Sequence, residues 1–361
     1  MILKGLIVKN SLHIQEQRTK NAIFHLLYGK RSIQTVQDAH LFQLGSYYGL
    51  LPMLTKQNYE IMMQKYITKG LLKQTYIDGQ KYIIPTLKGK HWLNKYKAQI
   101  PLHYFNGLRY FKIDYMFLER LMLLIQVLTN RHMNNSSFIP VINRTSIINW
   151  VKQMYPYFKQ DIQTCLYQLY DDLYALLSRL QDKEASLFLD RLTGYKHYGM
   201  SIHQLANKYN MSTLNIKLYL RAITHRMLRF IKEEVVKTRI LSILTKDLPS
   251  YNFMTKSAQL TYNLLQKQYS VHEIARLRQL KMSTINDHMI EIAWYDPHFP
   301  VHAFIEPSDI DKVEHAIKKT HSLQLKTIKD AVGDELTYFQ IRLALTRAKK
   351  IFTEGILCHD K

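Results

Sequence analysis

Two short helical segments joined at a sharp corner are predicted between Ser270 and His288. Ser270 is a favourable N-cap residue, and Ile274 lies on the apolar face of the first segment. Ala275 is small where a second helix must cross closely, and Ser283 is expected to cap that helix. This pattern is typical of a helix-turn-helix, whose second helix lies in the major groove of DNA. The first exposed residues of that helix are predicted to be Thr284, Asn286 and His288.

A second copy of this pattern lies upstream, where Ser201 and Ser212 are N-cap candidates for two successive helices. With the arginines that follow, the segment resembles region four of sigma factors, in which a helix-turn-helix of similar spacing contacts promoter DNA. No counterpart of the sigma factor core-binding regions is visible, so a sigma function is not expected. A purely structural helical hairpin is the alternative. The resemblance implies an exposed recognition face of Thr213, Asn215, Lys217 and Arg221, with Arg226 and Arg229 toward phosphates.

The charge of the chain favours a polyanionic partner. It has 50 Lys and Arg residues against 28 Asp and Glu residues, a formal net charge of +22. Such an excess favours nucleic acids because bound cations release counterions from phosphates. The excess is uneven: residues 191–240 hold ten basic residues against two glutamates, whereas residues 150–190 hold four against six acidic residues. A basic surface can also serve solubility alone, so the charge does not decide the function.

The first hundred residues have the pattern of a winged helix. Apolar helical runs are predicted at 22–27 and 37–44, followed by a helix that Thr55 caps and Gly70 ends. Two strand-like segments then flank Asp78 and Gly79, a strong signal for a hairpin. The wing is predicted to offer Lys73, Lys81, Lys88 and Lys90 to DNA, and the helix after Thr55 to offer Lys56, Gln57, Asn58 and Lys65. The alternative is a winged helix that packs only against a protein.

Residues 101–190 are predicted to form long helices over 115–129 and 160–192, with a loop at 134–140. Aromatic residues between Tyr104 and Phe117 could stack on bases, but their helical spacing favours a core. Asp171, Asp172 and Asp182 could be metal ligands, although a solvated helix face is the preferred interpretation. Because this region lacks the basic excess of its neighbours, we expect it to avoid DNA and to contact another protein.

The predicted fold class is mainly α, with several helix-turn-helix units and an N-terminal winged helix that carries a small β-hairpin. Four domains are expected: 1–100 (winged helix), 101–190 (helical, partner-binding), 191–245 (sigma-region-four-like) and 255–350 (C-terminal helix-turn-helix). The two cysteines, Cys165 and Cys358, lie too far apart in sequence to indicate a Cys-based zinc site. The expected location is the cytoplasm, in association with the nucleoid, without a membrane span.

No catalytic motif is found in the sequence. There is no Gly-x-x-x-x-Gly-Lys-Ser/Thr loop for phosphates, and the sixteen histidines form no His-x-His or His-Glu-x-x-His pair. Neither a Gly-x-Ser-x-Gly motif nor a cysteine beside a usable base occurs. The sequence therefore predicts a protein that is not an enzyme and needs no cofactor or metal.

The C-terminal segments 261–278 and 282–291 resemble the helix-turn-helix at the C-terminus of RecQ-type helicases, and residues 325–344 continue the pattern. Since the helicase motor is absent, the chain resembles the stand-alone YpbB-like proteins of low-GC Gram-positive bacteria over most of its length. The resemblance implies a DNA-binding accessory protein that partners a separate RecQ-like helicase in DNA repair or replication. Asp287 departs from this pattern because it would repel a phosphate. A helix-turn-helix transcription regulator is the alternative, and the oligomeric state stays open.

Overall fold

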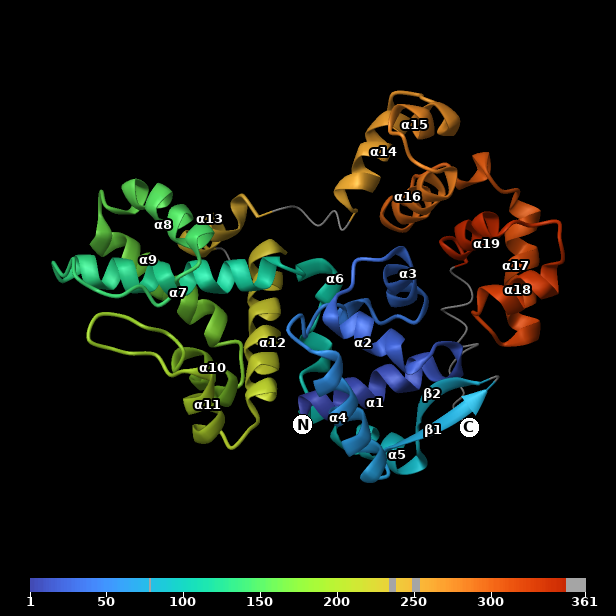
Figure 1. Ribbon diagram of the computed structural model, residues 1–361. Helices are drawn as coiled ribbons and strands as arrows, with labels where there is room; N and C mark the ends of the chain where they lie inside the picture. Colours follow the sequence, from blue (N-terminus) through green and yellow to red (C-terminus); the bar gives the residue numbers. More distant parts are fainter. Residues whose placement is uncertain (78, 234–237, 249–253, 349–361) are drawn as a thin grey trace. The chain divides into compact units, whose positions relative to one another are not determined.

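The computed structural model describes residues 1–77, 79–233, 238–248 and 254–348 (Figure 1). Asp78, Cys358 and the last two residues of the predicted 255–350 domain lie outside these ranges. The described chain is mainly helical, with one antiparallel hairpin near the N-terminus, which confirms the predicted fold class. No described helix combines the length and the apolar character that crossing a membrane would require.

The chain divides into two compact units, each described here by itself. The middle unit consists of residues 1–6 and 96–250, and the terminal unit consists of residues 7–95 and 251–361. The four predicted domain boundaries thus remain predictions within this coarser division. The first helix, α1 (Ile2–Ile14), contributes its first residues to the middle unit and the rest to the terminal unit.

The middle unit is built around two long helices, α7 (Ile113–His132) and α12 (Thr213–Lys232), which pack against each other. Around them lie η3 (Lys97–Gln99), η4 (Leu102–Tyr104), α6 (Gly107–Tyr110), α8 (Thr145–Phe158), α9 (Ile162–Leu177), α10 (Asp182–Leu189), α11 (Ile202–Lys208) and α13 (Ile240–Lys246). Phe105, Tyr110 and Phe117 are buried, so the aromatic residues of this region supply core contacts as their spacing indicated. The core therefore follows the apolar stripes of the two long helices.

The single helix predicted over 160–192 is wrong, because the chain breaks after Leu177 and restarts at Asp182. Gln181 and Glu184 form a capping box at this restart. Such a box satisfies free backbone N–H groups and favours a new helix start. Asp172 is also not on a solvated face: its buried carboxylate accepts backbone N–H groups of Arg239, Ile240 and Leu241 at the start of α13. The Asp172 carboxylate thus caps the N-terminus of the neighbouring helix α13.

The N-terminal part of the terminal unit has the element order of a winged helix. Its elements are the rest of α1, η1 (Gln15–Gln17), α2 (Lys20–Tyr28), α3 (Ile33–Leu41), η2 (Gly45–Tyr47), α4 (Lys56–Thr68), β1 (Leu72–Ile77), β2 (Gln80–Pro85) and α5 (Leu87–Tyr96). The strands pair antiparallel, with Leu72 opposite Pro85 and Ile77 opposite Gln80. The predicted sequence of three helices followed by a hairpin is therefore present.

The base of the hairpin is fixed where β1 approaches α5. The Thr86 hydroxyl donates to the Gly70 carbonyl and accepts the Gly89 N–H. A Cβ atom at Gly89 would lie 2.1 Å from the Leu71 carbonyl oxygen, so this close approach requires glycine. Both contacts hold the hairpin in place beside α4 and α5.

The C-terminal part of the terminal unit contains two successive groups of three helices. The first comprises α14 (Lys256–Gln266), α15 (Val271–Leu277) and α16 (Met282–Tyr295). After η5 (Val301–Ala303), the second comprises α17 (Pro307–Thr320), α18 (Leu325–Val332) and α19 (Tyr338–Leu345). In each group the helices pack against one another, so each has a small core of its own.

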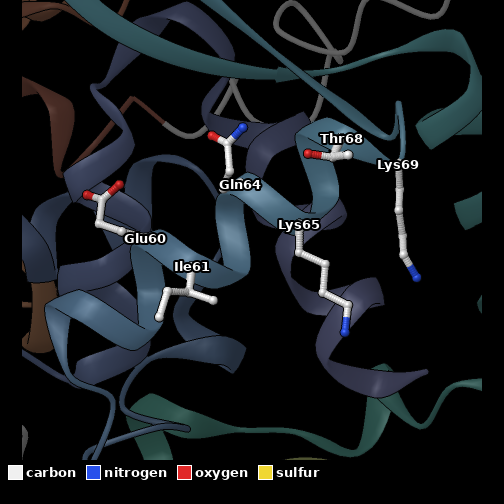
Figure 2. Close-up of a pocket in the computed structure, with 6 residues that line it drawn as sticks. All are labelled: Glu60, Ile61, Gln64, Lys65, Thr68 and Lys69. Carbon is white, nitrogen blue, oxygen red and sulfur yellow. The ribbon is translucent and has the colours of Figure 1, made fainter.

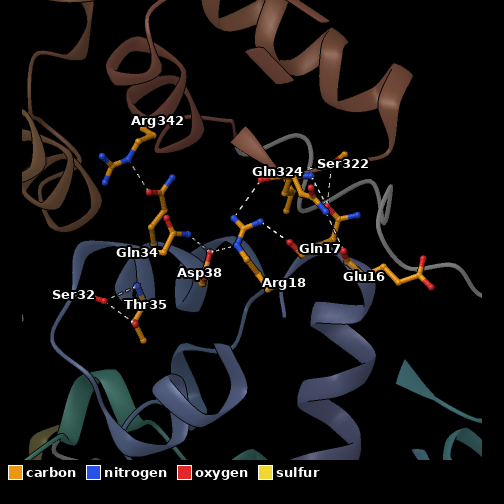
Figure 3. A network of polar contacts seen from close by, with 12 residues as sticks. Glu16, Gln17, Arg18, Ser32, Gln34, Thr35, Asp38, Ser322, Gln324 and Arg342 are labelled. Carbon is orange, nitrogen blue, oxygen red and sulfur yellow. Dashed lines mark hydrogen bonds and ion pairs between the residues drawn. The ribbon is translucent and has the colours of Figure 1, made fainter. Parts of the chain in front are cut away.

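The two ends of the terminal unit are joined by a polar network (Figure 3). Arg18 donates to the carboxylate of Asp38 at 2.9 Å and to the Leu323 carbonyl at 3.3 Å. The Gln17 side-chain oxygen accepts the Leu323 N–H at 2.8 Å, and Gln324 donates to the Glu16 carbonyl at 3.0 Å. Helix α16 packs in addition against α3 of the winged helix. The winged helix and the C-terminal helices therefore share one scaffold.

Candidate nucleic-acid interface

Helix α4 is the third helix of the winged helix and has one face open to solvent. Thr55 caps it by accepting the Asn58 N–H, as the sequence predicted. Its apolar side is buried, and the Tyr59 hydroxyl there donates to the Lys20 carbonyl at 2.7 Å. The opposite side is exposed and polar, with the single apolar exception of Ile61. The exposed side chains are Lys56, Gln57, Asn58, Ile61, Gln64, Lys65, Thr68 and Lys69.

A shallow hollow of about 600 Å³ follows this exposed face (Figure 2). It is lined by Glu60, Ile61, Gln64, Lys65 and Thr68 of α4 and by Lys69, the C-cap residue that follows it. The single carboxylate in this lining belongs to Glu60, which is paired with Lys20 of α2. Because that charge is already neutralised, the α4 face presents an overall positive potential.

The hairpin extends this basic face along the chain. Lys73 and Lys88 are exposed and Lys81 is half-buried, whereas Tyr82 and Ile83 are buried and anchor β2. Between residues 55 and 97 the sequence has nine lysines against Glu60 and Asp78. The part of the chain that the structure describes offers no carboxylate partner to Lys65, Lys69, Lys73 or Lys88. These ammonium groups are therefore available to an external anion.

The C-terminal helix-turn-helix, α15 and α16, begins as the sequence predicted. The Ser270 hydroxyl accepts the Glu273 N–H, and the Glu273 carboxylate accepts the Ser270 N–H, which makes a capping box. The second helix, however, begins at Met282 with Lys281 as its N-cap residue, so the prediction that Ser283 caps it is wrong. Lys281 already has the extended backbone of an N-cap, and Ser283 lies inside the first turn.

His288 is not exposed on α16, contrary to the prediction. Its side chain is buried, and Nδ1 shares a hydrogen bond of 2.9 Å with the Thr261 hydroxyl of α14. Burial, together with the nearby Arg278, lowers the pKa of His288 below its ordinary value. Thr284 and Asn286 are half-buried. His288, one of the three residues predicted to contact bases, therefore belongs to the core between α14 and α16.

The middle of α16 is covered by its neighbours α3 and α19. Asp287 pairs with Arg342 of α19 at 2.7 Å, and the Trp294 indole stacks on the His40 ring of α3 with centroids 4.7 Å apart. Asp287 is the acidic residue that departs from the helix-turn-helix pattern of RecQ-type helicases. Its ion pair with Arg342 explains why an acidic residue stands at this position. Lys281 and Ser283 at the start of α16 are exposed, and the Asp287 side chain keeps 41% of its exposure beside Arg342.

The upstream helix pair, α11 and α12, also begins at its predicted caps. Ser201 forms a capping box with Gln204, and Ser212 accepts the Asn215 N–H. Thr213 and Asn215 are half-buried, and the Asn215 side-chain oxygen accepts the Leu3 N–H at 3.1 Å. Lys217 is exposed as predicted. The first two turns of α12 therefore contact α1 on one side and solvent on the other.

Two of the arginines predicted to face DNA from α12 are engaged inside the middle unit. Arg221 pairs with the buried carboxylate of Asp114 on α7, with Nε and Oδ2 2.6 Å apart. Arg226 donates to the Tyr104 hydroxyl at 2.9 Å and to the Glu184 carboxylate at 3.4 Å. The expectation of an exposed Arg221 is therefore wrong, because the long helix α12 lies in the core of its unit and its cations have internal partners. Arg229 is half-buried beside the Phe230 ring.

Helix α4 contacts β1, which carries Lys73, and β1 pairs with β2, which carries Lys81, whereas Lys88 lies in α5. The other predicted residues lie on separate elements. Sequence reasoning had missed Ile61, Gln64 and Lys69. The signal for Ile61 and Gln64 is the helical period, since they occupy the side of α4 opposite the buried Tyr59 and Met62, whereas Lys69 follows the last residue of the helix. Among the described residues no cluster of three or more His, Cys, Asp or Glu side chains is placed to hold a metal ion.

Comparison with known proteins places a helix-turn-helix in the terminal unit. A family model described as a helix-turn-helix domain matches residues 257–345, which correspond to α14–α19. The chain is also 28% identical over 342 residues to protein YpbB of Bacillus subtilis (strain 168), an alignment that covers 92% of this chain and 94% of that protein. No solved structure matches the chain. The chain is therefore similar to YpbB over most of its length, and its residues 257–345 match a helix-turn-helix domain.

Proposed function

We propose that this protein is a non-catalytic DNA-binding accessory protein that partners and targets a RecQ-like DNA helicase in DNA repair or replication. The observation that carries the DNA-binding part is the exposed, lysine-bearing face of α4, which continues into the hairpin. The helix-turn-helix match and the net charge of +22 agree with this proposal.

The shape of the α4 face suits the major groove of duplex DNA, which admits one α-helix. Lys56 and Lys65 would contact phosphates, while Gln57, Asn58 and Gln64 have the amide groups that can hydrogen-bond to base edges. The hairpin would lie over the neighbouring backbone and bring Lys73 and Lys88 to further phosphates. Because this surface is rich in cations, it would bind many sequences through phosphate contacts.

The C-terminal helices have a different part in the proposal. The helix that a helix-turn-helix would insert into DNA, α16, is packed against α3 and α19. The domain would thus hold the winged helix rigidly and add contacts only from its first turn, at Lys281 and Ser283. Rigid support of this kind raises affinity because less conformational freedom is lost on binding.

The helicase partnership rests on the resemblance of residues 255–350 to a domain that is otherwise fused to a helicase motor. A physical contact would replace that lost covalent link, and several weak contacts would raise the local concentration of the helicase at DNA. The second candidate, a transcription regulator, is favoured by the amide side chains exposed on α4, which are able to hydrogen-bond to base edges. It predicts a dimer that binds one short duplex sequence, since two recognition helices must span half-sites.

The test compares two triple variants of the full chain on labelled duplex and forked DNA. Lys65→Ala, Lys69→Ala and Lys73→Ala should together lower affinity by roughly 10- to 100-fold at moderate salt and reduce the salt slope by about 2 to 3. The control changes Lys152, Lys183 and Lys246 of the middle unit, which are also exposed, to Ala. Equal affinities of both variants and the parent would show that DNA binds elsewhere.

The partner is tested separately, by mixing the chain with the purified RecQ-like helicase of the same cell. Co-elution and a changed unwinding rate on the forked duplex are expected. If neither occurs while the chain binds one duplex sequence as a dimer, the regulator is the better description.

A further inference from the structure

Three tyrosines form an exposed aromatic stripe on α9 of the middle unit. Tyr167, Tyr170 and Tyr174 are 64%, 65% and 65% exposed. They are spaced three and four residues apart, so they lie on one face of the helix. The rings of Tyr170 and Tyr174 stack on each other with centroids 6.1 Å apart and an interplanar angle of 17°. The opposite face of α9 is buried through Leu169 and Leu176, against α7 and α13.

The three rings of this stripe lie outside the buried core of their unit. Side chains that contribute to a core lose most of their exposure, whereas each of these rings keeps about two thirds of it. Isolated exposed tyrosines are common, but three on one helical face make a continuous aromatic surface. Tyrosine is enriched in protein interfaces because a large rigid ring is combined with a polar hydroxyl. The stripe is thus suited to a contact with another molecule.

The charges around the stripe favour a protein over a nucleic acid as its binding partner. Helix α9 contains no Lys or Arg, although the chain has 50 such residues. Asp171 is exposed between Tyr170 and Tyr174, and the exposed Asp161 caps the start of the helix. Surfaces that stack bases of single-stranded DNA combine aromatic rings with cations that follow the phosphates. An acidic aromatic face instead complements an apolar groove with a basic rim.

We propose that Tyr167, Tyr170 and Tyr174 form a docking surface for a protein partner that has an apolar groove rimmed by Lys or Arg side chains. Their spacing corresponds to that of the anchor residues of a helix bound in a groove, at positions i, i+3 and i+7. Asp171 pairs with the basic rim of the groove. The proposal rests on the proposed function to the extent that it assigns this groove to the RecQ-like helicase.

The test measures binding of the full chain to the purified helicase by calorimetry. Changing all three tyrosines to Ala should weaken binding at least about 30-fold, because hot-spot aromatic residues dominate such interfaces. Asp171→Lys should weaken it severalfold at low salt and less at high salt. The matched control changes Tyr76 and Tyr198, which are 67% and 87% exposed elsewhere, to Ala and should bind like the parent. Circular dichroism and thermal unfolding verify that the triple variant is folded, which is expected because Ala favours helix.

The outcomes separate this surface from the proposed partnership. If the parent does not bind the helicase, both fail. If the parent and the triple variant bind the helicase equally, the assignment to α9 is overturned and the partnership stands. If the triple variant keeps its helicase affinity but loses affinity for an oligo-dT single strand, the tyrosines contact bases, and the protein-docking proposal is likewise overturned.

Discussion

Arg221 of α12 and Asp114 of α7 form a buried ion pair in the core of the middle unit, with side-chain exposures of 16% and 4%. His225 completes the group: its Nδ1 accepts the Asn106 N–H at 3.0 Å, so Nε2 carries the proton that it donates to Asp114. Burial by itself would raise the pKa of Asp114, but Arg221 and His225 lower it below its ordinary value. The carboxylate is therefore charged in the folded protein.

Arg221→Ala is expected to destabilise the protein by about 3 kcal/mol, because it leaves the Asp114 charge buried with one cation fewer. Lys217→Ala, one turn earlier on the same helix and exposed, should change the free energy of unfolding by less than about 0.5 kcal/mol. Urea unfolding of both variants measures the difference. Equal stabilities would mean that the ion pair contributes little to the fold.

The stack of His40 on Trp294 predicts a dependence of stability on pH. Burial lowers the pKa of His40 to about 4, from an ordinary value of 6.5. Between these values the unfolded chain binds a proton that the folded chain does not, so stability is lost as the pH falls from about 6.5 to about 4. At pH 5 this loss amounts to about 2 kcal/mol.

His40→Phe keeps an aromatic ring against Trp294 and removes the titration. Urea unfolding at pH 7 and pH 5 should show a smaller difference for this variant than for the parent. Because other groups titrate in both proteins, the informative quantity is the difference between the two pH dependences. A variant as pH-dependent as the parent would contradict the assignment to His40.

Gly89→Ala should destabilise the winged helix by about 1 to 3 kcal/mol, because overpacking forces the backbone apart. Its Cβ would meet the Leu71 carbonyl oxygen at 2.1 Å, where no flexible side chain can yield. Gly79→Ala is the matched control: its φ of +72° is strained for Ala, but open space surrounds it. Thermal unfolding should show that Gly79→Ala lowers the free energy of unfolding by about 1 kcal/mol, which is less than Gly89→Ala does.

DNA binding by the full chain should depend steeply on salt. A surface that neutralises several phosphates loses affinity by roughly a thousandfold when the salt concentration rises about fourfold. The measurement is fluorescence anisotropy with duplexes of unrelated sequence, which should have similar affinities. Tight binding to one sequence that barely changes with salt would contradict this prediction and favour the regulator.

Local signals in the sequence predicted four of the helix starts correctly, whereas the predicted cap Ser283 and the unbroken helix over 160–192 were wrong. Thr55, Ser201, Ser212 and Ser270 all cap helices where predicted, since a cap is a hydrogen bond between residues two or three positions apart. Lys56, Gln57, Asn58 and Lys65 were predicted and are exposed, because burial of Tyr59 and Met62 leaves the opposite side of a helix exposed, whereas Gln64 on the same side was missed.

Which of the predicted recognition helices remains exposed was decided only by the tertiary structure. By sequence, α4, α12 and α16 are all amphipathic helices with polar residues near their starts. Arg221 is partnered by a residue more than a hundred positions away, and α16 is covered by α3 and α19. A periodic pattern specifies which face of a helix is apolar, but not how many neighbours cover the polar face. That number depends on contacts between distant segments, which bury α12 and α16 and leave the lysine face of α4 open.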